Sequence, residues 1–194
     1  LEKGASEMVD ANLSEIIVLC DKMAELTRQF KVFARKSEGP PAVVDLRQPI
    51  DASLKIIVAQ QSSSEIDIQW RRPEAPVMCH GDLIRIEQVM VNLMANAVQA
   101  VEGGERPEIR IDIEETEHCW KCLVRDNGPG LQGDTEQIFE PFFTTKSVKQ
   151  GLGLGLSISR QIVDALGGSL IGRNRKDGPG AEFVVTLKKR EATE

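Results

Sequence analysis

The chain has 194 residues, of which 41% are hydrophobic and 28% are charged, and its formal net charge at pH 7 is −6. This composition is ordinary for a globular protein, and the acidic balance argues against broad nucleic-acid binding, which requires a basic surface. The sequence has no apolar run long enough to span a bilayer and no recognisable signal peptide. Because the chain starts at Leu1 rather than Met, we expect a piece of a longer protein.

Residues 8–36 carry one long helical pattern. Apolar residues recur four and three positions apart, with a polar interruption at Thr27, and further apolar residues widen the stripe. A wide stripe suits a helix in a bundle better than a two-stranded coiled coil, although a helix packed on its own domain would also show one. The Ser-, Gly- and Pro-rich stretch that follows indicates a linker. We therefore predict a bundle helix in residues 1–37, a linker in residues 38–44 and a second domain in residues 45–190.

The second domain mixes helices and strands. Periodicity near 3.6 predicts helices, and alternation of apolar and polar residues predicts strands. The helices are expected in residues 45–61, 82–101 and about 155–166, and the strands in residues 66–70, 76–80, 108–117, 118–126, 169–175 and 181–189. Asp45 and Asp82 are candidate N-caps of the first two helices. Several antiparallel hairpins and few βαβ units predict an α/β sandwich, with one mixed sheet and helices on one face.

The helix predicted at residues 82–101 carries two asparagines, Asn92 and Asn96, which lie one turn apart and therefore share a face. An amide oxygen is a neutral, hard ligand of the kind that Mg²⁺ accepts. The alternative is that both side chains are simply exposed, and the helix alone does not decide between the two interpretations.

The stretch DNGPG at residues 126–130 ends a predicted strand. An ionised Asp126 accepts hydrogen bonds but donates none, and beside a pocket it would suit an exocyclic amine such as that of adenine. Gly128 and Gly130 would let the backbone approach the ring. A plain Asx turn explains the same residues.

Residues 151–159 read GLGLGLSIS and lead into a predicted helix. No Lys-Ser or Lys-Thr pair follows the glycines, so they do not form a P-loop, and no strand precedes them, so they do not form a dinucleotide fingerprint. What remains is a glycine-rich loop at a helix N terminus, which offers N–H groups and the positive end of the helix dipole to a phosphate. A tight turn that only glycine can make is the alternative.

The cysteines and histidines do not indicate a metal site. Cys119 and Cys122 have CxxC spacing, but on a predicted strand residues three apart point to opposite faces. We interpret all four cysteines as reduced packing residues, and His80 and His118 as surface residues.

Five stretches, NLMANA, DNGPG, FEPFFTTK, GLGLGLSIS and GPGAEF, occur in this order along the chain. Together they resemble the ATP-binding domain of sensor histidine kinases of two-component systems, over residues 40–190. Residues 23–35 resemble the second helix of that family's dimerisation and phosphotransfer bundle. Within the family, the arrangement looks closest to the nitrogen-regulatory and C4-dicarboxylate transport sensor kinases. The resemblance implies a Bergerat-type ATP-binding fold, with ATP and Mg²⁺ as cofactors, preceded by part of the dimerisation bundle.

The resemblance also implies a role for each matching residue. Asn92 and Asn96 match the asparagine box, which acts in catalysis and holds Mg²⁺ chiefly through Asn96, and Asp126 matches the aspartate that reads adenine. The other residues implied to bind the nucleotide are Gly128, Gly130, Phe142, Thr145, Lys146, Gly151, Leu152, Gly153, Leu154, Gly155 and Gly180. The remaining members of the phenylalanine and glycine boxes are Phe139, Phe143 and Gly178.

The chain departs from the family pattern at three points. Gln99 stands where many relatives carry Lys or Arg, and Ala181 stands where Thr or Ser is common. The family's phosphoacceptor histidine lies on the first bundle helix, and neither histidine of this chain lies on a predicted bundle helix. We therefore expect the acceptor upstream of Leu1.

The implied activity is transfer of the ATP γ-phosphoryl group to that upstream histidine, so the chain alone is not expected to autophosphorylate. An ATPase of the gyrase, Hsp90 or MutL type would carry a Glu one turn before the metal asparagine as a base for water. The residue here is Asn92, whose amide cannot take a proton at neutral pH, which favours a kinase. A non-catalytic nucleotide-binding dimerisation module is a third interpretation, and the complete set of asparagines, Asp126 and glycines argues against it.

The implied partners are a response regulator receiver domain and a second copy of the protein, joined through the bundle helix, with no nucleic acid. The chain is expected to be a cytoplasmic portion that does not itself span a membrane, in a parent that is an inner-membrane sensor. Neither the signal nor the cognate response regulator can be inferred from the sequence.

Overall fold

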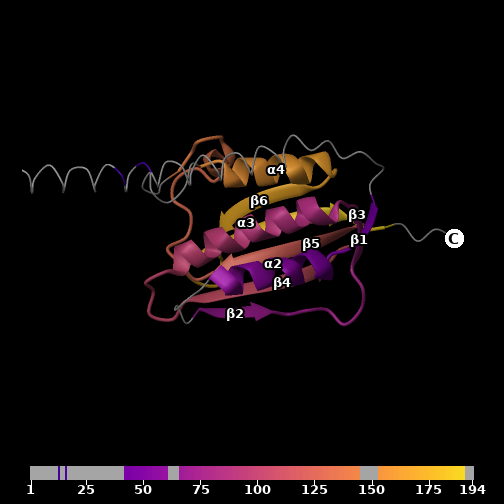
Figure 1. Cartoon of the computed structure of the whole chain (residues 1–194), viewed down its shortest axis with the longest axis horizontal. Coiled ribbons are helices and arrows are strands. Elements are labelled where there is room, and N and C mark those ends of the chain that lie inside the picture. Colours follow the sequence, from indigo (N-terminus) through magenta and orange to yellow (C-terminus); the bar gives the residue numbers. More distant parts are fainter. Residues whose placement is uncertain (1–12, 14–15, 17–41, 61–65, 145–152, 191–194) are drawn as a thin grey trace, which may run out of the picture.

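The computed structural model describes residues 13, 16, 42–60, 66–144 and 153–190 (Figure 1). Leu13 and Ile16 are exposed, and the rest of the predicted bundle helix lies outside the described residues. Within the described parts of the chain, no helix combines the length and the apolar character that crossing a membrane requires.

A five-stranded mixed sheet forms the centre of the domain, with strand order β2-β4-β5-β7-β6. Its strands are β2 (Asp67–Trp70), β4 (Glu108–Glu115), β5 (Cys119–Asp126), β6 (Ser169–Asn174) and β7 (Ala181–Lys188). The β2 strand runs parallel to β4, and every other neighbouring pair is antiparallel. The two hairpins predicted from alternation, β4-β5 and β6-β7, are confirmed.

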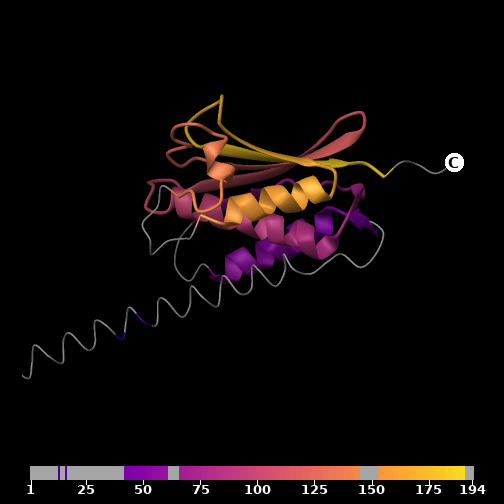
Figure 2. The ribbon, with the colours of Figure 1, turned by 90° about the horizontal axis from the view of Figure 1, so that it is seen from above.

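The α-helices of the described domain pack on one face of this sheet, as Figure 2 shows. They are α2 (Arg47–Gln60), α3 (Leu83–Val101) and α4 (Gly155–Ala165), and a 3₁₀ turn, η1 (Gln137–Phe139), precedes α4. The core lies between helices and sheet, and in α3 the buried side chains recur along one face: Ile86, Val89, Met90, Leu93, Met94, Ala97 and Val101. The predicted two-layer architecture with helices on one face is therefore confirmed.

The opposite face of the sheet is covered by charged side chains. Arg125 of β5 forms ion pairs with Asp112 of β4 and Glu182 of β7, and Glu182 also pairs with Arg173 of β6. These long side chains lie across four neighbouring strands, which explains how this face stays polar while the other face is buried.

The start of the domain differs from the sequence-based prediction. Residues 42–44, which the sequence assigns to a linker, lie in β1 (Ala42–Asp45), and β1 pairs antiparallel with β3 (Met78–Gly81). Helix α2 accordingly begins at Arg47 and not at Asp45, which ends β1. The Asp45 carboxylate accepts hydrogen bonds from the backbone N–H groups of Arg47 and Val77, at 3.2 and 3.1 Å, so it joins the end of β1 to the start of α2 and to the residue before β3.

Candidate functional site

Asp126 is the last residue of β5, the central strand of the sheet, and lies on the face that the helices cover. Its side chain is only 2% exposed, and its Oδ1 accepts hydrogen bonds from the backbone N–H groups of Gly128 (2.9 Å) and Ala181 (3.2 Å). Burial raises the pKa of this carboxyl group, and those two N–H groups and the nearby Arg175 act in the opposite direction. The strand end thus presents a buried carboxyl group in a fixed orientation.

The loop after Asp126 is packed against α3. A Cβ added to Gly128 would lie 2.5 Å from the carbonyl oxygen of Ala100, in the last turn of that helix. Asn127 joins the same loop to the start of β4, because its Oδ1 accepts from the N–H of Glu108 and its Nδ2 donates to the carbonyl of Arg106. The backbone at position 128 therefore lies against the backbone of α3, which leaves no room for a side chain and explains why this residue is glycine.

Gly180 brings the connection between β6 and β7 against Asp126 from the other side. Its φ is +109°, a region that side chains rarely adopt, and an added Cβ would overlap the carbonyl of Asp126. At Gly178, by contrast, an added Cβ would come only within 4.0 Å of Arg175. Gly178 and Gly180 look equivalent in the sequence. In the structure, only Gly180 of the two is required by the packing around Asp126.

Asn92 and Asn96 lie one turn apart on α3, and both side chains are half-buried. The Nδ2 of Asn92 donates a hydrogen bond to the Oγ of Ser159 in α4, at 2.9 Å. Its Oδ1 lies where a Cβ on Gly155 would be, so glycine at the first position of α4 leaves room for the Asn92 amide. Asn92 therefore sets how the N terminus of α4 lies against α3.

The N terminus of α4 follows the glycine-rich stretch predicted to bind phosphate. Leu154 occupies the N-cap position, and its side chain has no oxygen to accept hydrogen bonds from the N–H groups of the first turn. Gly153 accepts a hydrogen bond at its carbonyl from the N–H of Phe142, at 3.0 Å. Thr145, Lys146, Gly151 and Leu152, which belong to the same predicted site, lie outside the described residues.

The three phenylalanines of the FEPFF stretch have different environments. Phe139 is buried, and the Arg160 guanidinium of α4 stacks 4.7 Å from the centre of its ring. Phe143 packs against the core at its edge. Phe142 is 71% exposed and has a φ of 66°, which is uncommon for a residue with a bulky side chain. Phe139 therefore anchors the segment, and Phe142 presents its ring to the surroundings.

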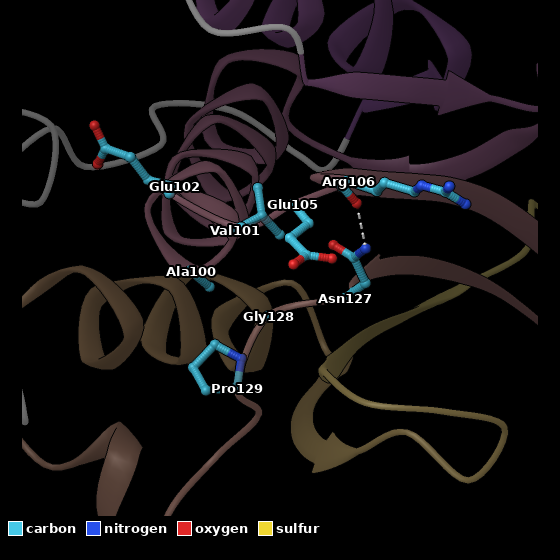
Figure 3. Close-up of a pocket in the computed structure, with 10 residues that line it drawn as sticks. Ala100, Val101, Glu102, Glu105, Arg106, Asn127, Gly128 and Pro129 are labelled. Carbon is cyan, nitrogen blue, oxygen red and sulfur yellow. Dashed lines mark hydrogen bonds between the residues drawn. The ribbon is translucent and has the colours of Figure 1, made fainter.

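A pocket of about 290 Å³ lies beside this site, between the end of α3, the α3-β4 loop and Gly128-Pro129. Figure 3 shows Glu105 and Asn127 on one side of it and Pro129 on the other, while the Arg106 side chain points away. Neither Asp126 nor either asparagine of α3 lines this pocket. We therefore do not assign it to the predicted nucleotide site.

The described cysteines and histidines differ in burial, and Cys20 lies outside the described residues. Cys122 is buried and Cys119 is only partly exposed, on opposite faces of β5, and Cys79, Cys119 and Cys122 are all free thiols. His80 and His118 are exposed. In the parts of the chain that the structure describes, no group of three or more His, Cys, Asp or Glu side chains is placed to hold a metal ion.

Sequence reasoning missed several residues that build this site. Asn127 and Ser159 lie inside the stretches DNGPG and GLGLGLSIS, but nothing in those stretches indicates a separate role for them. Asn174 and Arg175 stand at the end of a strand without a motif of their own. Their partners are far away in the sequence, so no local pattern identifies them. The only available signal was position, because Asn127 directly follows Asp126 and the pair Asn174-Arg175 begins the connection that carries Gly180.

Comparison with known families agrees with this geometry. A family model described as "Histidine kinase-, DNA gyrase B-, and HSP90-like ATPase" matches residues 81–191, from the end of β3 past the end of β7. The chain belongs to this family. The matched region contains both asparagines of α3, Asp126 and the glycines on either side of it.

Similar proteins include sensor kinases. The C4-dicarboxylate transport sensor protein DctB of Rhizobium meliloti (strain 1021) is 32% identical over 191 residues, which cover 97% of this chain and 30% of that protein. The solved catalytic domain of histidine kinase ThkA, in a nucleotide-free form, has 32% identity and a TM-score of 0.68, over 78% of this chain and 97% of that one. Histidine kinase ThkA in complex with response regulator protein TrrA gives 27% identity and a TM-score of 0.71, over 91% of this chain and 51% of that one.

These comparisons establish the fold of the ATPase domain as that of histidine kinase catalytic domains. The chain spans 30% of the length of the DctB relative. The fold therefore does not identify the signal, the phosphorylation target or the partners of the longer sensor proteins.

Proposed function

We propose that this ATPase domain is the catalytic domain of a two-component sensor histidine kinase, which binds ATP with Mg²⁺ and transfers the γ-phosphoryl group to a histidine on another segment of the sensor. The observation that carries the proposal is the environment of Asp126. A buried carboxyl group with one oxygen held by two backbone N–H groups suits recognition of a base, because its orientation is set before the ligand arrives.

The base would be adenine. An ionised carboxylate accepts a hydrogen bond from the exocyclic amine of adenine, whereas guanine has a carbonyl oxygen at that position and offers no donor there. Gly128, Gly130 and Gly180 would keep side chains away from the ring on the loops that surround Asp126. Gly128 and Gly180 also allow the close backbone packing that holds Asp126 in place, which a Cβ would block.

The phosphates would lie at the N terminus of α4, next to Gly153, Leu154 and Gly155, with the positive end of the helix dipole facing them. Mg²⁺ prefers oxygen ligands and keeps several waters. The described part of the chain offers no carboxylate cluster for it, so the amide oxygens of Asn96 and, secondarily, Asn92 are the proposed protein ligands. The proposed nucleotide site also includes Phe142, Thr145, Lys146, Gly151 and Leu152.

Phosphoryl transfer is favoured over hydrolysis by the chemistry of position 92. A hydrolase needs a base one turn before the metal asparagine to take a proton from water, and the amide of Asn92 cannot take one. Its hydrogen bond to Ser159 supports a positioning role instead. The protein's contribution to transfer would then be to hold donor and acceptor in line and to stabilise charge on the phosphoryl group.

The acceptor is proposed to be a histidine upstream of this chain, since His80 and His118 are exposed on β3 and at the β4-β5 turn and neither lies on a helix. We further propose a dimer through the bundle helix in residues 1–37, a response regulator receiver domain as partner, and a membrane-bound parent that senses C4-dicarboxylates. The similarity to the C4-dicarboxylate transport sensor protein DctB supports the proposed signal, and the solved complex of ThkA with response regulator protein TrrA supports the proposed partner. The proposed dimer is supported by the apolar helical pattern of residues 8–36.

Two measurements on the purified chain test the proposal. Calorimetry should show binding of ATP or ADP that strengthens with Mg²⁺. Incubation with γ-labelled ATP should leave the chain unlabelled, and addition of the upstream helix of the sensor should produce acid-labile, base-stable phosphate on that helix. Stoichiometric labelling of His80 or His118, or rapid ATP hydrolysis without any acceptor, would contradict the assignment.

A further inference from the structure

The connection between β6 and β7 holds the loop that follows Asp126. Asn174, the last residue of β6, accepts a hydrogen bond at Oδ1 from the N–H of Leu131 (2.6 Å) and donates one from Nδ2 to the carbonyl of Leu131 (3.0 Å). One amide side chain thus satisfies both backbone groups of a residue 43 positions away, much as a paired strand would.

Glycine at position 130 leaves room for this contact. Its φ is +80°, and an added Cβ would lie 2.7 Å from Oδ1 of Asn174. A side chain at position 130 would therefore push the Asn174 amide away from Leu131. The contact between Asn174 and Leu131 therefore requires glycine at position 130, whether or not a ligand approaches this loop.

Arg175 holds the other end of the same loop. Its side chain is 10% exposed, and its Nη1 donates a hydrogen bond to the carbonyl oxygen of Asp126, at 3.2 Å. Asp177 orients the guanidinium through two hydrogen bonds of 3.1 Å, and the N–H of Arg175 donates to the carbonyl of Gly180. Asn174 and Arg175 therefore fix the two ends of the loop from Asp126 to Leu131.

We propose that Asn174 and Arg175 are positioning residues for base recognition, an inference that rests on the proposed function of Asp126. The link is the N–H of Gly128, which holds Oδ1 of Asp126. Gly128 is joined to the clamped Leu131 through Pro129, whose ring fixes φ, and Gly130. A shift at Leu131 is therefore transmitted to Gly128 and turns the carboxylate that would read the base.

The readout that separates positioning from general stability is base selectivity. Adenine offers a donor to Asp126 and guanine does not, so a turned carboxylate weakens ADP binding and leaves GDP binding almost unchanged. A purely structural role would lower the melting temperature but preserve the ratio of the two dissociation constants. The probes are ADP and GDP with Mg²⁺, measured by calorimetry on the full chain.

Two variants and one matched control make the experiment specific. Asn174→Ala removes both bonds to Leu131, and because Asn174 lies at the surface the variant is expected to fold. Arg175→Met removes the bond to Asp126 together with one positive charge. Lys176→Met removes the same charge from the next residue, which is exposed, and so controls for the attraction of a cation to phosphate.

We expect Asn174→Ala and Arg175→Met to narrow the preference for ADP over GDP by roughly three- to tenfold, the effect of one or two hydrogen bonds, and Lys176→Met to keep the wild-type ratio. Wild-type ratios in both variants, with or without a lower melting temperature, would overturn the positioning role alone. A wild-type chain that binds neither nucleotide, or binds both equally, would overturn the proposed function and this inference with it.

Discussion

The side-chain amide of Asn92 in α3 donates a hydrogen bond to the hydroxyl oxygen of Ser159 in α4, with 2.9 Å between Nδ2 and Oγ. Ser159 is buried, and Gly155, one turn before it, lies against Oδ1 of the same amide. Both polar ends of Asn92 therefore face α4. The distance from Asn96 to the N terminus of α4 depends on this contact.

Replacing Ser159 with Ala should destabilise the domain through this pair of residues. The variant leaves the half-buried Asn92 amide without its acceptor between two packed helices, which costs at most the roughly 1–3 kcal/mol of a fully buried donor. Urea unfolding should show a midpoint below that of wild type. Ser169→Ala is the matched control, because Ser169 is exposed at the start of β6, and its effect should stay within about 0.5 kcal/mol. Equal effects of the two substitutions would contradict the proposed importance of the contact.

Asp126→Asn should stabilise the nucleotide-free domain near neutral pH. Burial raises the pKa of Asp126 above its ordinary value of 3.8. A carboxyl group with a raised pKa contributes stability that is complete below the unfolded value and is lost as pH rises through the folded value. Asn keeps an oxygen for the N–H groups of Gly128 and Ala181 without the buried charge. The gain over wild type should appear at pH 7 and disappear toward pH 3, with Asp164→Asn, on the exposed side of α4, as control.

The same substitution should weaken nucleotide binding. Loss of a charge-assisted hydrogen bond costs about 1.5–3 kcal/mol, which corresponds to roughly a ten- to hundredfold higher dissociation constant for ADP. Calorimetry at pH 7 on the variant and on the Asp164→Asn control provides the measurement. A variant that becomes more stable yet binds ADP as tightly as wild type would show that Asp126 does not read the base.

Much of the fold could be predicted from local patterns. Helix α3 shows strong apolar periodicity and an N-cap at Asp82, whose side chain accepts from the N–H groups of Ile84 and Arg85 as expected. The strands β4 and β5 alternate clearly and pair as a hairpin. In contrast, β1 could not be predicted, because residues 42–45 follow two prolines and become a strand only through pairing with β3, far along the chain.

The site, like the fold, could be predicted from local patterns only in part. A strand that ends in Asp126 and a pair of asparagines on one helical face follow from spacing alone. That Asp126 is buried depends on Ala181 and Gly180, which arrive from another hairpin. The contacts of Asn92 with Ser159 and of Asn174 with Leu131 join segments that are distant in the sequence, so no periodicity predicts them.

Gly180→Ala should disrupt the site more than its unusual backbone angle explains. Gly133 provides a control for a positive φ, since its φ is +74° and an added Cβ would meet nothing within 4 Å. Gly133→Ala should therefore cost only the strain of a positive φ, about 1–3 kcal/mol. At position 180 the added Cβ also overlaps the Asp126 carbonyl, so we expect a larger fall in melting temperature together with loss of ADP binding. Equal melting temperatures for the two variants would contradict the close packing around Asp126.

The thiols should react selectively according to their burial. Burial raises the pKa values of Cys79 and Cys122 to about 12, so almost no thiolate forms at pH 8, whereas Cys119 on the other face of β5 is partly exposed. Treatment of the native chain with iodoacetamide, followed by peptide mass spectrometry, should show alkylation at Cys119 well before Cys79 or Cys122. All three should react once urea unfolds the domain. Cys119→Ser controls for the assignment, and native-state alkylation of Cys122 at the rate of Cys119 would show that the core around β5 opens far more readily than its packing implies.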